Sequence, residues 1–169
     1  MSIDAIRYKT LNNVIDTLKC VGEDHKQIKA VTTGDIWDID LSKNTLFPLF
    51  HINLISVDAG KGQLQYNFQL VVADLVEPNE AENEQEVLSD TLSIMLDIVA
   101  IFKNGEKLYL YNTVHGEEAR YWTIDDFTLE PFTERFDNAI SGFTLTLPIV
   151  IEWVYDTCNI PITTDICVK

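Results

Sequence analysis

The feature that most constrains the fold is a pair of alternating apolar and polar segments on either side of a glycine-rich turn at residues 58–62. The alternating apolar residues before the turn are Phe50, Ile52 and Leu54. After the turn they are Leu64, Tyr66, Phe68, Leu70 and Val72. Period-two patterning on both sides of such a turn predicts an antiparallel β-hairpin with one face in the core. The other face carries uncharged amides, which favours contact between sheets or subunits.

Two helices are predicted around the hairpin. Residues 2–21 have apolar residues at helical spacing, with Ser2 placed to cap the helix and Gly22 to end it. Residues 80–102, after Pro78, predict a long central helix with acidic residues in its first turns, where they complement the helix dipole. The predicted apolar stripe of this helix comprises Leu88, Thr91, Leu92, Met95, Ile98, Val99 and Phe102, widened by Val87, Ile94 and Ile101.

The rest of the chain predicts shorter strands and turns. Strands are expected at residues 28–33, 37–41, 108–111, 127–129 and 143–151, with a turn or short helix over 130–141 and a terminal turn at 159–161. A chain of 169 residues fits one domain. We therefore expect residues 1–169 to form a single α+β domain, in which an antiparallel or mixed sheet is flanked by an N-terminal helix and a long central helix.

The charge balance limits the partners of the protein. The chain carries 12 Lys and Arg against 27 Asp and Glu, a net charge of -15. Residues 77–137 contain 15 of the acidic residues and 4 of the basic ones. Such a charge repels nucleic-acid backbones and anionic membranes. The acidic block predicts a solvated face, a surface that does not adhere to anionic partners, or a docking site for a basic partner.

Residues 1–7 lack the apolar stretch of a signal peptide, and no segment reaches the ~18 apolar residues of a membrane span. We therefore expect the product to remain in the cytoplasm of the cell that makes it. Cys20, Cys158 and Cys167 are odd in number and lack CxxC spacing. This predicts reduced thiols, with neither a disulfide framework nor a zinc site.

The sequence contains no convincing catalytic or metal-binding pattern. His25, His51 and His115 lie in separate segments without metal-ligand spacing, which favours structural or surface roles. The acidic trio Asp35, Asp38 and Asp40 lacks the glycine and terminal glutamate of a calcium loop.

Two further patterns bear on binding. Residues 60–62, Gly-Lys-Gly, are not followed by Ser or Thr and lie in the predicted hairpin, unlike a phosphate-binding loop. Four aromatic residues favour core or interface packing over a nucleic-acid platform, because no Lys or Arg cluster accompanies them: Tyr109, Tyr111, Tyr121 and Trp122. The sequence predicts no catalytic residues, no cofactor and no metal.

Several segments carry a family resemblance. They are residues 47–52 (Phe-Pro-Leu-Phe-His-Ile), the hairpin, the helix over 90–102, the segments 129–137 and 141–143, and the end at 156–162. Over residues 45–162 the chain resembles tail-terminator and head–tail connector proteins of tailed bacteriophages, as in crAss-like and other phages of Bacteroidetes hosts.

The resemblance implies a non-enzymatic virion protein, a subunit of a hexameric or dodecameric ring at the head–tail junction, at the tail tube end or in a tail hub. Its partners would be further copies of itself and neighbouring portal, connector or tail proteins. Genomic DNA would pass through the ring without specific binding, and no membrane is implied. The protein would reside in the virion, and in the host cytoplasm before assembly. An acidic, non-adhesive lumen suits this role, because attraction to phosphate would retain the genome.

Two alternatives remain open. A small acidic phage protein could mimic DNA and inhibit a host nuclease, and the acidic block at 77–137 fits this alternative. The chain could also be an enzyme with an unrecognised site. Sizing separates the first two functions, because a ring subunit forms hexamers or dodecamers, or stays monomeric until it meets its neighbour. A mimic is a monomer or dimer that binds a basic nuclease cleft tightly.

Overall fold

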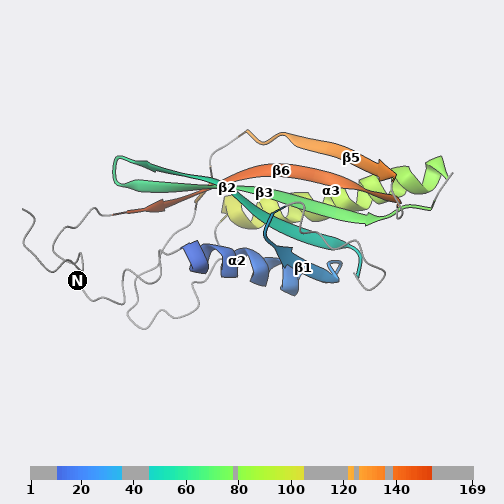
Figure 1. Cartoon of the computed structure of the whole chain (residues 1–169), viewed down its shortest axis with the longest axis horizontal. Helices are drawn as coiled ribbons and strands as arrows, with labels where there is room; N and C mark the ends of the chain where they lie inside the picture. The colour runs from blue at the N-terminus through green and yellow to red at the C-terminus, as the bar shows by residue number, and fades with distance from the viewer. Residues whose placement is uncertain are drawn as a thin grey trace, which may run out of the picture.

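The computed structural model of the chain describes residues 11–35, 46–77, 80–104, 122–123, 126–135 and 139–153. These residues form one mixed six-stranded sheet and two helices (Figure 1). The elements are α2 (Leu11–Asp24), β1 (Ala30–Thr33), β2 (Leu49–Gly60), β3 (Gln63–Leu75), α3 (Ala81–Asn104), β4 (Trp122–Thr123), β5 (Leu129–Arg135) and β6 (Ala139–Glu152). The strand order is β1-β2-β3-β6-β4, and β5 also pairs with β6. The predicted α+β class, with a sheet, an N-terminal helix and a long central helix, is confirmed.

The predicted hairpin is confirmed as β2 and β3. The two strands pair antiparallel from Leu49 opposite Ala73 to Gly60 opposite Gln63, which leaves residues 61 and 62 in the turn. Gly62 has a φ of 74°, in the left-handed region that glycine enters without steric cost. Lys61 is not among the residues with a positive φ, so the turn carries its glycine at the second central position, as in a type II turn.

β6 is longer than the sequence predicts. It pairs antiparallel with β3 along the whole length of β3, from Gln63 opposite Glu152 to Leu75 opposite Ile140. The expected turn or short helix over 130–141 is wrong, because β5 covers 129–135 and pairs antiparallel with the first half of β6. The expected strand at 127–129 is also wrong, since β5 begins only at Leu129. Among the described strands β5 pairs only with β6, so Pro131 on this edge removes no inner ladder bond.

β1 lies parallel to the first part of β2, with Ala30 opposite Leu49 and Thr33 opposite Ile52. The strand predicted at 28–33 is therefore confirmed in a shorter form. The pairing ends at Gly34, whose N–H donates to the carbonyl of Ile52. The elements predicted at 37–41, 108–111 and 159–161 lie outside the described residues.

One hydrophobic cluster joins both helices to the same face of the sheet. Its fully buried members include Phe50, Phe68, Phe102, Leu18, Ile52, Leu70, Ile94, Met95, Ile98, Leu145 and Leu147. Each such side chain removed from water contributes about 1.5–3 kcal/mol of transfer free energy. The sheet residues in the cluster follow the alternation that predicted the hairpin, so the core face is the one that the sequence indicates.

Gly22 does not end α2, as the sequence suggested, because the helix continues to Asp24. Gly22 is buried, and a Cβ at this position would lie 2.5 Å from a ring carbon of Phe50 and 2.9 Å from a methyl carbon of Val31. The glycine therefore permits close approach of α2 to the sheet. Ser2, the expected N-cap, lies outside the described residues.

The long central helix is confirmed as α3, and its buried residues all belong to the predicted apolar stripe, including Val87 and Ile94, which widened it. Leu88 and Leu92, which were also predicted in the stripe, are only partly buried and lie at its edge. The hydroxyl of buried Thr91 donates a hydrogen bond to the carbonyl of Val87 at 2.7 Å, so it has a partner within the helix.

The face of the sheet opposite the helices is also buried near the β1 end. Leu49, His51, Val71 and Ala73 are each at most 4% exposed there. Both faces of β2 and β3 are thus covered at this end. The other end of the hairpin is exposed, and the candidate surface lies at that end.

Candidate assembly surface

The distal part of the β2–β3 hairpin, residues 55–65, extends beyond both helices and is called the hairpin arm below (Figure 1). Every residue from 55 to 63 is exposed. Two large apolar side chains are among them, Ile55 at 53% exposed and Val57 at 44% exposed. The arm therefore presents apolar surface to solvent while adding little to the core.

The arm is a supported extension of the sheet. β6 pairs with β3 along it, with Leu64 opposite Ile151 and Gln65 opposite Val150. Trp122 in β4 pairs in turn with Val150. Cross-strand pairing on this scale holds the arm as part of the sheet, so that it can present a defined surface to a partner.

A β-bulge separates the arm from the packed part of β2. The register shifts between Leu54, opposite Phe68, and Ser56, opposite Asn67, which leaves Ile55 as the extra residue. A bulge bends the strand and changes which groups face outward. The sequence carried a signal for it, because the adjacent apolar residues Leu54 and Ile55 break the strict alternation.

β2 is the outer strand of the arm within the described part of the chain. β1 covers only residues 49–52 of β2, and the pairing ends where Gly34 donates to the Ile52 carbonyl. From residue 53 onward, the described residues place no strand beside β2 on the side away from β3. An open strand edge of this kind can pair with a strand of another chain.

The polar face of the arm is held by its own hydrogen bonds. The Asn67 amide donates to the hydroxyl of Ser56 at 2.9 Å and to the carboxylate of Asp58 at 2.6 Å. The Gln65 amide donates to the Asn67 oxygen at 2.8 Å. The amides that suggested a subunit contact are therefore partly satisfied within the chain, and the exposed apolar residues Ile55 and Val57 are the stronger indication of an interface.

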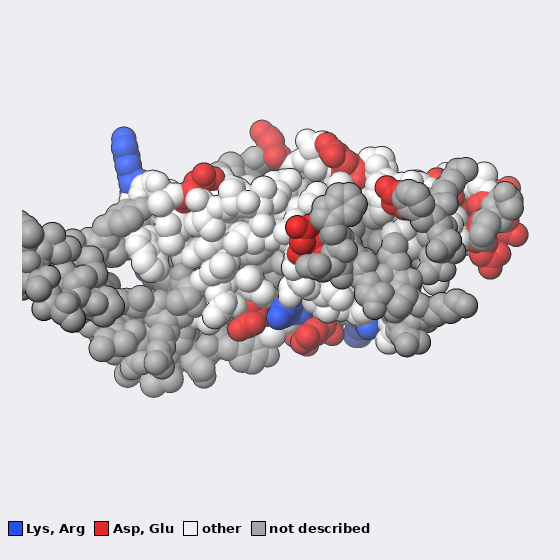
Figure 2. Space-filling model, in the orientation of Figure 1, with Lys and Arg blue, Asp and Glu red and all other residues white. Residues whose placement is uncertain are grey.

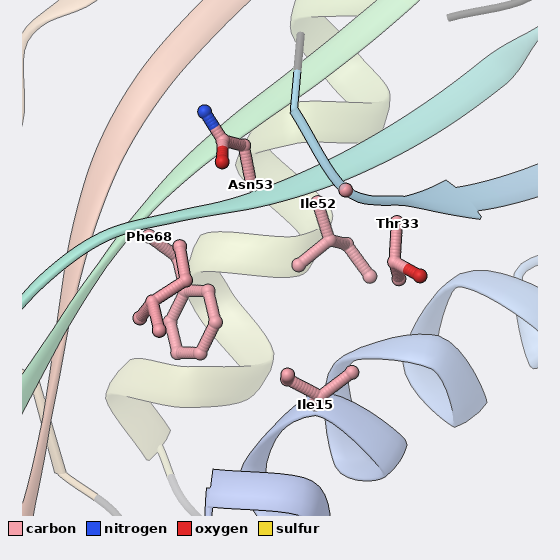
Figure 3. Close-up of a pocket in the computed structure, with 7 residues that line it drawn as sticks. Ile15, Thr33, Ile52, Asn53 and Phe68 are labelled. Atoms are coloured by element: carbon pink, nitrogen blue, oxygen red, sulfur yellow. The ribbon is translucent and has the colours of Figure 1, made fainter. Parts of the chain in front are cut away.

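A cavity of about 360 Å³ lies beside the base of the arm, where β1 leaves the edge of β2 (Figure 3). Its lining is formed by Ile15, Thr33, Gly34, Ile52, Asn53, Leu54 and Phe68. Figure 3 shows Ile15, Ile52 and Phe68 directed toward one another, whereas the Asn53 side chain points to the opposite side of β2. These lining residues include no ionisable group, so the cavity suits a small or apolar group and offers no acid–base pair.

The histidines and the acidic trio do not converge on one site. His25, at the end of α2, lies 3.4 Å from the carboxylate of Asp97 in α3. His51 is buried in β2, with its Nδ1 2.8 Å from the Thr32 hydroxyl. Asp35 is exposed after β1. The remaining candidates, His115, Asp38 and Asp40, lie outside the described residues.

In the Gly60-Lys61-Gly62 segment, Gly60 ends β2, and Lys61 and Gly62 form the hairpin turn. It precedes β3 and not a helix, so it lacks the helix N-terminus on which a phosphate loop depends. Of the aromatic group, Trp122 pairs in β4, whereas Tyr109, Tyr111 and Tyr121 lie outside the described residues.

Acidic side chains gather at the end of the molecule where α3 begins, remote from the hairpin turn (Figure 2). The first turns of α3 carry Glu82, Glu84 and Glu86. Asp74, at the adjoining end of β3, has its pKa raised by burial and secondarily by Asp90, although the Leu75 N–H opposes the shift. Sequence reasoning located the glutamates but missed the interaction of Asp74 with Asp90 of α3.

Two hydroxyl groups connect this end of the sheet to α3. The Thr133 hydroxyl in β5 donates to a carboxylate oxygen of Glu84 at 2.8 Å and lies 3.0 Å from the Ser141 hydroxyl. Buried Ser141 donates to the carbonyl of Phe132. The sequence predicts a turn or short helix around both hydroxyls, and only the pairing of β5 with β6 brings them together.

Metal binding and membrane insertion find no support in the described ranges. Within them, no three His, Cys, Asp or Glu side chains lie close enough together to hold a metal ion. Neither α2 nor α3 combines the length and hydropathy that a bilayer-spanning helix needs. Cys20 is partly buried.

Comparison with known proteins gives no family assignment. No protein-family model matches the chain, and no curated protein matches it significantly.

Proposed function

We propose that this protein is a non-enzymatic virion structural protein, a subunit of an oligomeric ring at the phage head–tail junction or tail. The observation that carries the proposal is the hairpin arm, which exposes Ile55 and Val57 on a strand edge that no described strand covers. Soluble monomers blunt such edges, because exposed backbone donors and acceptors recruit other strands. An arm built in this way suits a protein whose partners complete its structure.

The charge of the chain fits the same function. A net charge of -15 disfavours adhesion to DNA, as a ring around translocating DNA requires. It also makes the copies repel one another, so that ring closure should strengthen as salt shortens the Debye length to ~8–10 Å. A basic neighbouring protein could neutralise the charge in place of salt.

The acidic end of the molecule favours one alternative, an inhibitor that mimics DNA and binds a host nuclease. Acidic side chains gather there (Figure 2), and the first turns of α3 carry Glu82, Glu84 and Glu86. A mimic would bind through this end and would leave the hairpin arm without a role. The two functions therefore use opposite ends of the molecule.

The test is the protein content of purified phage particles from a host that carries the gene. Mass spectrometry should find the protein at a fixed copy number per particle, consistent with one hexameric or dodecameric ring. Native mass spectrometry of the isolated chain over a salt series should show association that rises with salt. A protein absent from particles that binds a nuclease tightly, and that loses binding when Glu82 and Glu86 become Gln, would establish the inhibitor instead.

A further inference from the structure

We infer that the hairpin arm binds a second copy of itself, with the β2 edges of two subunits paired antiparallel about a two-fold axis at Val57. This inference deepens the proposed function by naming what the arm contacts, and it rests on that function in taking the arm as an assembly surface. A contact of this type is isologous, so each copy uses the same residues.

The backbone of the arm is oriented for such pairing. The Ile52 carbonyl accepts from Gly34, so the groups of Ile52 point away from β3. In an antiparallel ladder the backbone N–H and C=O groups of successive residues point alternately toward the partner strand and away from it. The extra residue at the bulge shifts this alternation by one residue along the rest of β2. The N–H and C=O groups of Val57 and Ala59 consequently face outward at the open edge.

The two edges of the sheet differ in how they are protected. β5, on the far side of β6, carries Pro131, Glu130 and Glu134, all exposed. Proline and charge are common means of preventing strand addition. The segment of β2 from residue 55 to 60 has no proline or lysine, and its only charge is Asp58, which already accepts from Asn67. β5 pairs with β6 over residues 139–145 and does not flank the arm, so the second copy is placed against the β2 edge.

The side-chain sequence selects the register. Centring the pair on Val57 places Val57 opposite its own copy, Ile55 opposite Ala59, and Ser56 opposite Asp58. Apolar groups then meet apolar groups, and each carboxylate meets a hydroxyl. A register centred on Asp58 would oppose two carboxylates, which is destabilising. A register centred on Ala59 would place Lys61 opposite Val57.

The cavity beside the arm fits the same register. With Val57 on the axis, residues 60 and 61 of the second copy lie opposite Leu54 and Asn53. These two residues line the cavity, together with Gly34 where β1 ends (Figure 3). The glycine-rich turn of one copy therefore lies beside the cavity of the other copy. The cavity is located where the open edge of β2 ends.

A two-fold contact closes after two copies, whereas a ring closes through head-to-tail contacts. The arm contact would therefore join two stacked rings in a dodecamer of dihedral symmetry, or form a dimer of the free chain. Ring closure requires a second surface.

The test is disulfide trapping in the full chain after Cys20, Cys158 and Cys167 are changed to Ser. Under mild oxidation Val57→Cys should form a covalent dimer, because paired strands place opposite Cα atoms ~4.5–5.5 Å apart, within disulfide range. A mixture of Ile55→Cys and Ala59→Cys should form the mixed dimer. Ala59→Cys alone should not, since its copies are ~13 Å apart along the strands.

Two controls separate pairing from misfolding and from random collision. Val57→Lys should abolish the non-covalent dimer in analytical ultracentrifugation at an unchanged melting temperature, because the side chain is exposed and edge lysines block strand addition. Leu96→Cys, exposed on α3, reports collisional crosslinking.

Equal crosslinking at positions 57, 59 and 96, or none at any of them at millimolar protein, would overturn the inference. Rings in which the Val57→Cys variant forms no crosslink would overturn the two-fold contact and leave the proposed function standing. Crosslinked dimers of a protein that is absent from particles would support the two-fold contact and overturn the proposed function.

Discussion

Replacing Gly22 by alanine tests how closely α2 packs on the sheet, because two effects of known size oppose each other. Alanine in a helix interior is favoured over glycine by about 1 kcal/mol. Against this gain, the new Cβ would lie 2.5 Å from a ring carbon of Phe50 and 2.9 Å from a methyl of Val31. Optimal carbon contacts are ~3.5–4.0 Å. Phe50 is fully buried and cannot turn away into solvent.

Overpacking of this kind typically costs about 1–3 kcal/mol. The net prediction is that Gly22→Ala lowers the free energy of unfolding by up to about 2 kcal/mol. Urea denaturation followed by circular dichroism gives this quantity. The matched control is Gly60→Ala, where the added Cβ meets no atom within 4 Å and stability should change by less than ~0.5 kcal/mol.

A double variant tests whether the Phe50 ring causes the destabilisation by Gly22→Ala. Phe50→Leu removes the ring that Gly22 approaches, so Gly22→Ala should cost less in that background, with a favourable coupling energy of at least ~0.5 kcal/mol. Stabilisation of the protein by Gly22→Ala alone would refute the packing of α2 described above, because helix propensity would then be unopposed.

Three further substitutions probe the core and the acidic end. Phe68→Ala should cost about 3–5 kcal/mol in urea denaturation, because the ring is fully buried. Asp74→Asn should stabilise the protein at neutral pH and lose this advantage in acid. Because the pKa of Asp74 is raised in the folded protein, its contribution to the free energy of unfolding is fully present below the pKa of the unfolded state, where the carboxyl is protonated. That contribution is lost as the pH rises through the pKa of the folded state and the buried carboxyl ionises. Thr133→Val should cost about 1 kcal/mol, since it removes the hydroxyl that donates to Glu84.

Each of these predictions has a contradicting outcome. A loss below ~1 kcal/mol for Phe68→Ala would mean that the core face of β3 is misassigned. A stabilisation by Asp74→Asn that does not change with pH would exclude a titration effect. If Thr133→Val and Glu84→Gln were additive in a double-mutant cycle, the hydroxyl would not bind that carboxylate.

The sequence predicted the elements whose periodicity was unambiguous. The hairpin and the core face of β3 followed from the alternation at Tyr66, Phe68 and Leu70, and α3 followed from its helical spacing. The buried residues of α3 all lie within the predicted stripe, but its edges did not follow, because Leu88 and Leu92 fit the same spacing and are only partly buried. Packing against the sheet decides where the stripe ends.

Other features depend on contacts between distant segments. Residues 130–141 look like a turn or short helix because Pro131 and several charges interrupt any pattern, yet pairing with β6 makes 129–135 a strand. Gly22 resembled a helix terminator, and only the position of Phe50 shows that it permits close packing. The open edge at Val57 could not be predicted either, since the coverage of β2 depends on where β1 ends.

The most direct measurement for the central proposal is a cryo-electron microscopy reconstruction of the neck and tail of phage particles that carry this gene. We expect a closed ring of density into which the sheet of β1-β2-β3-β6-β4, with α2 and α3 on one face, fits once per subunit. In that density the arm residues Ile55 and Val57 should be buried against another strand. A complete reconstruction of neck and tail in which every ring is accounted for by other proteins would contradict the proposal.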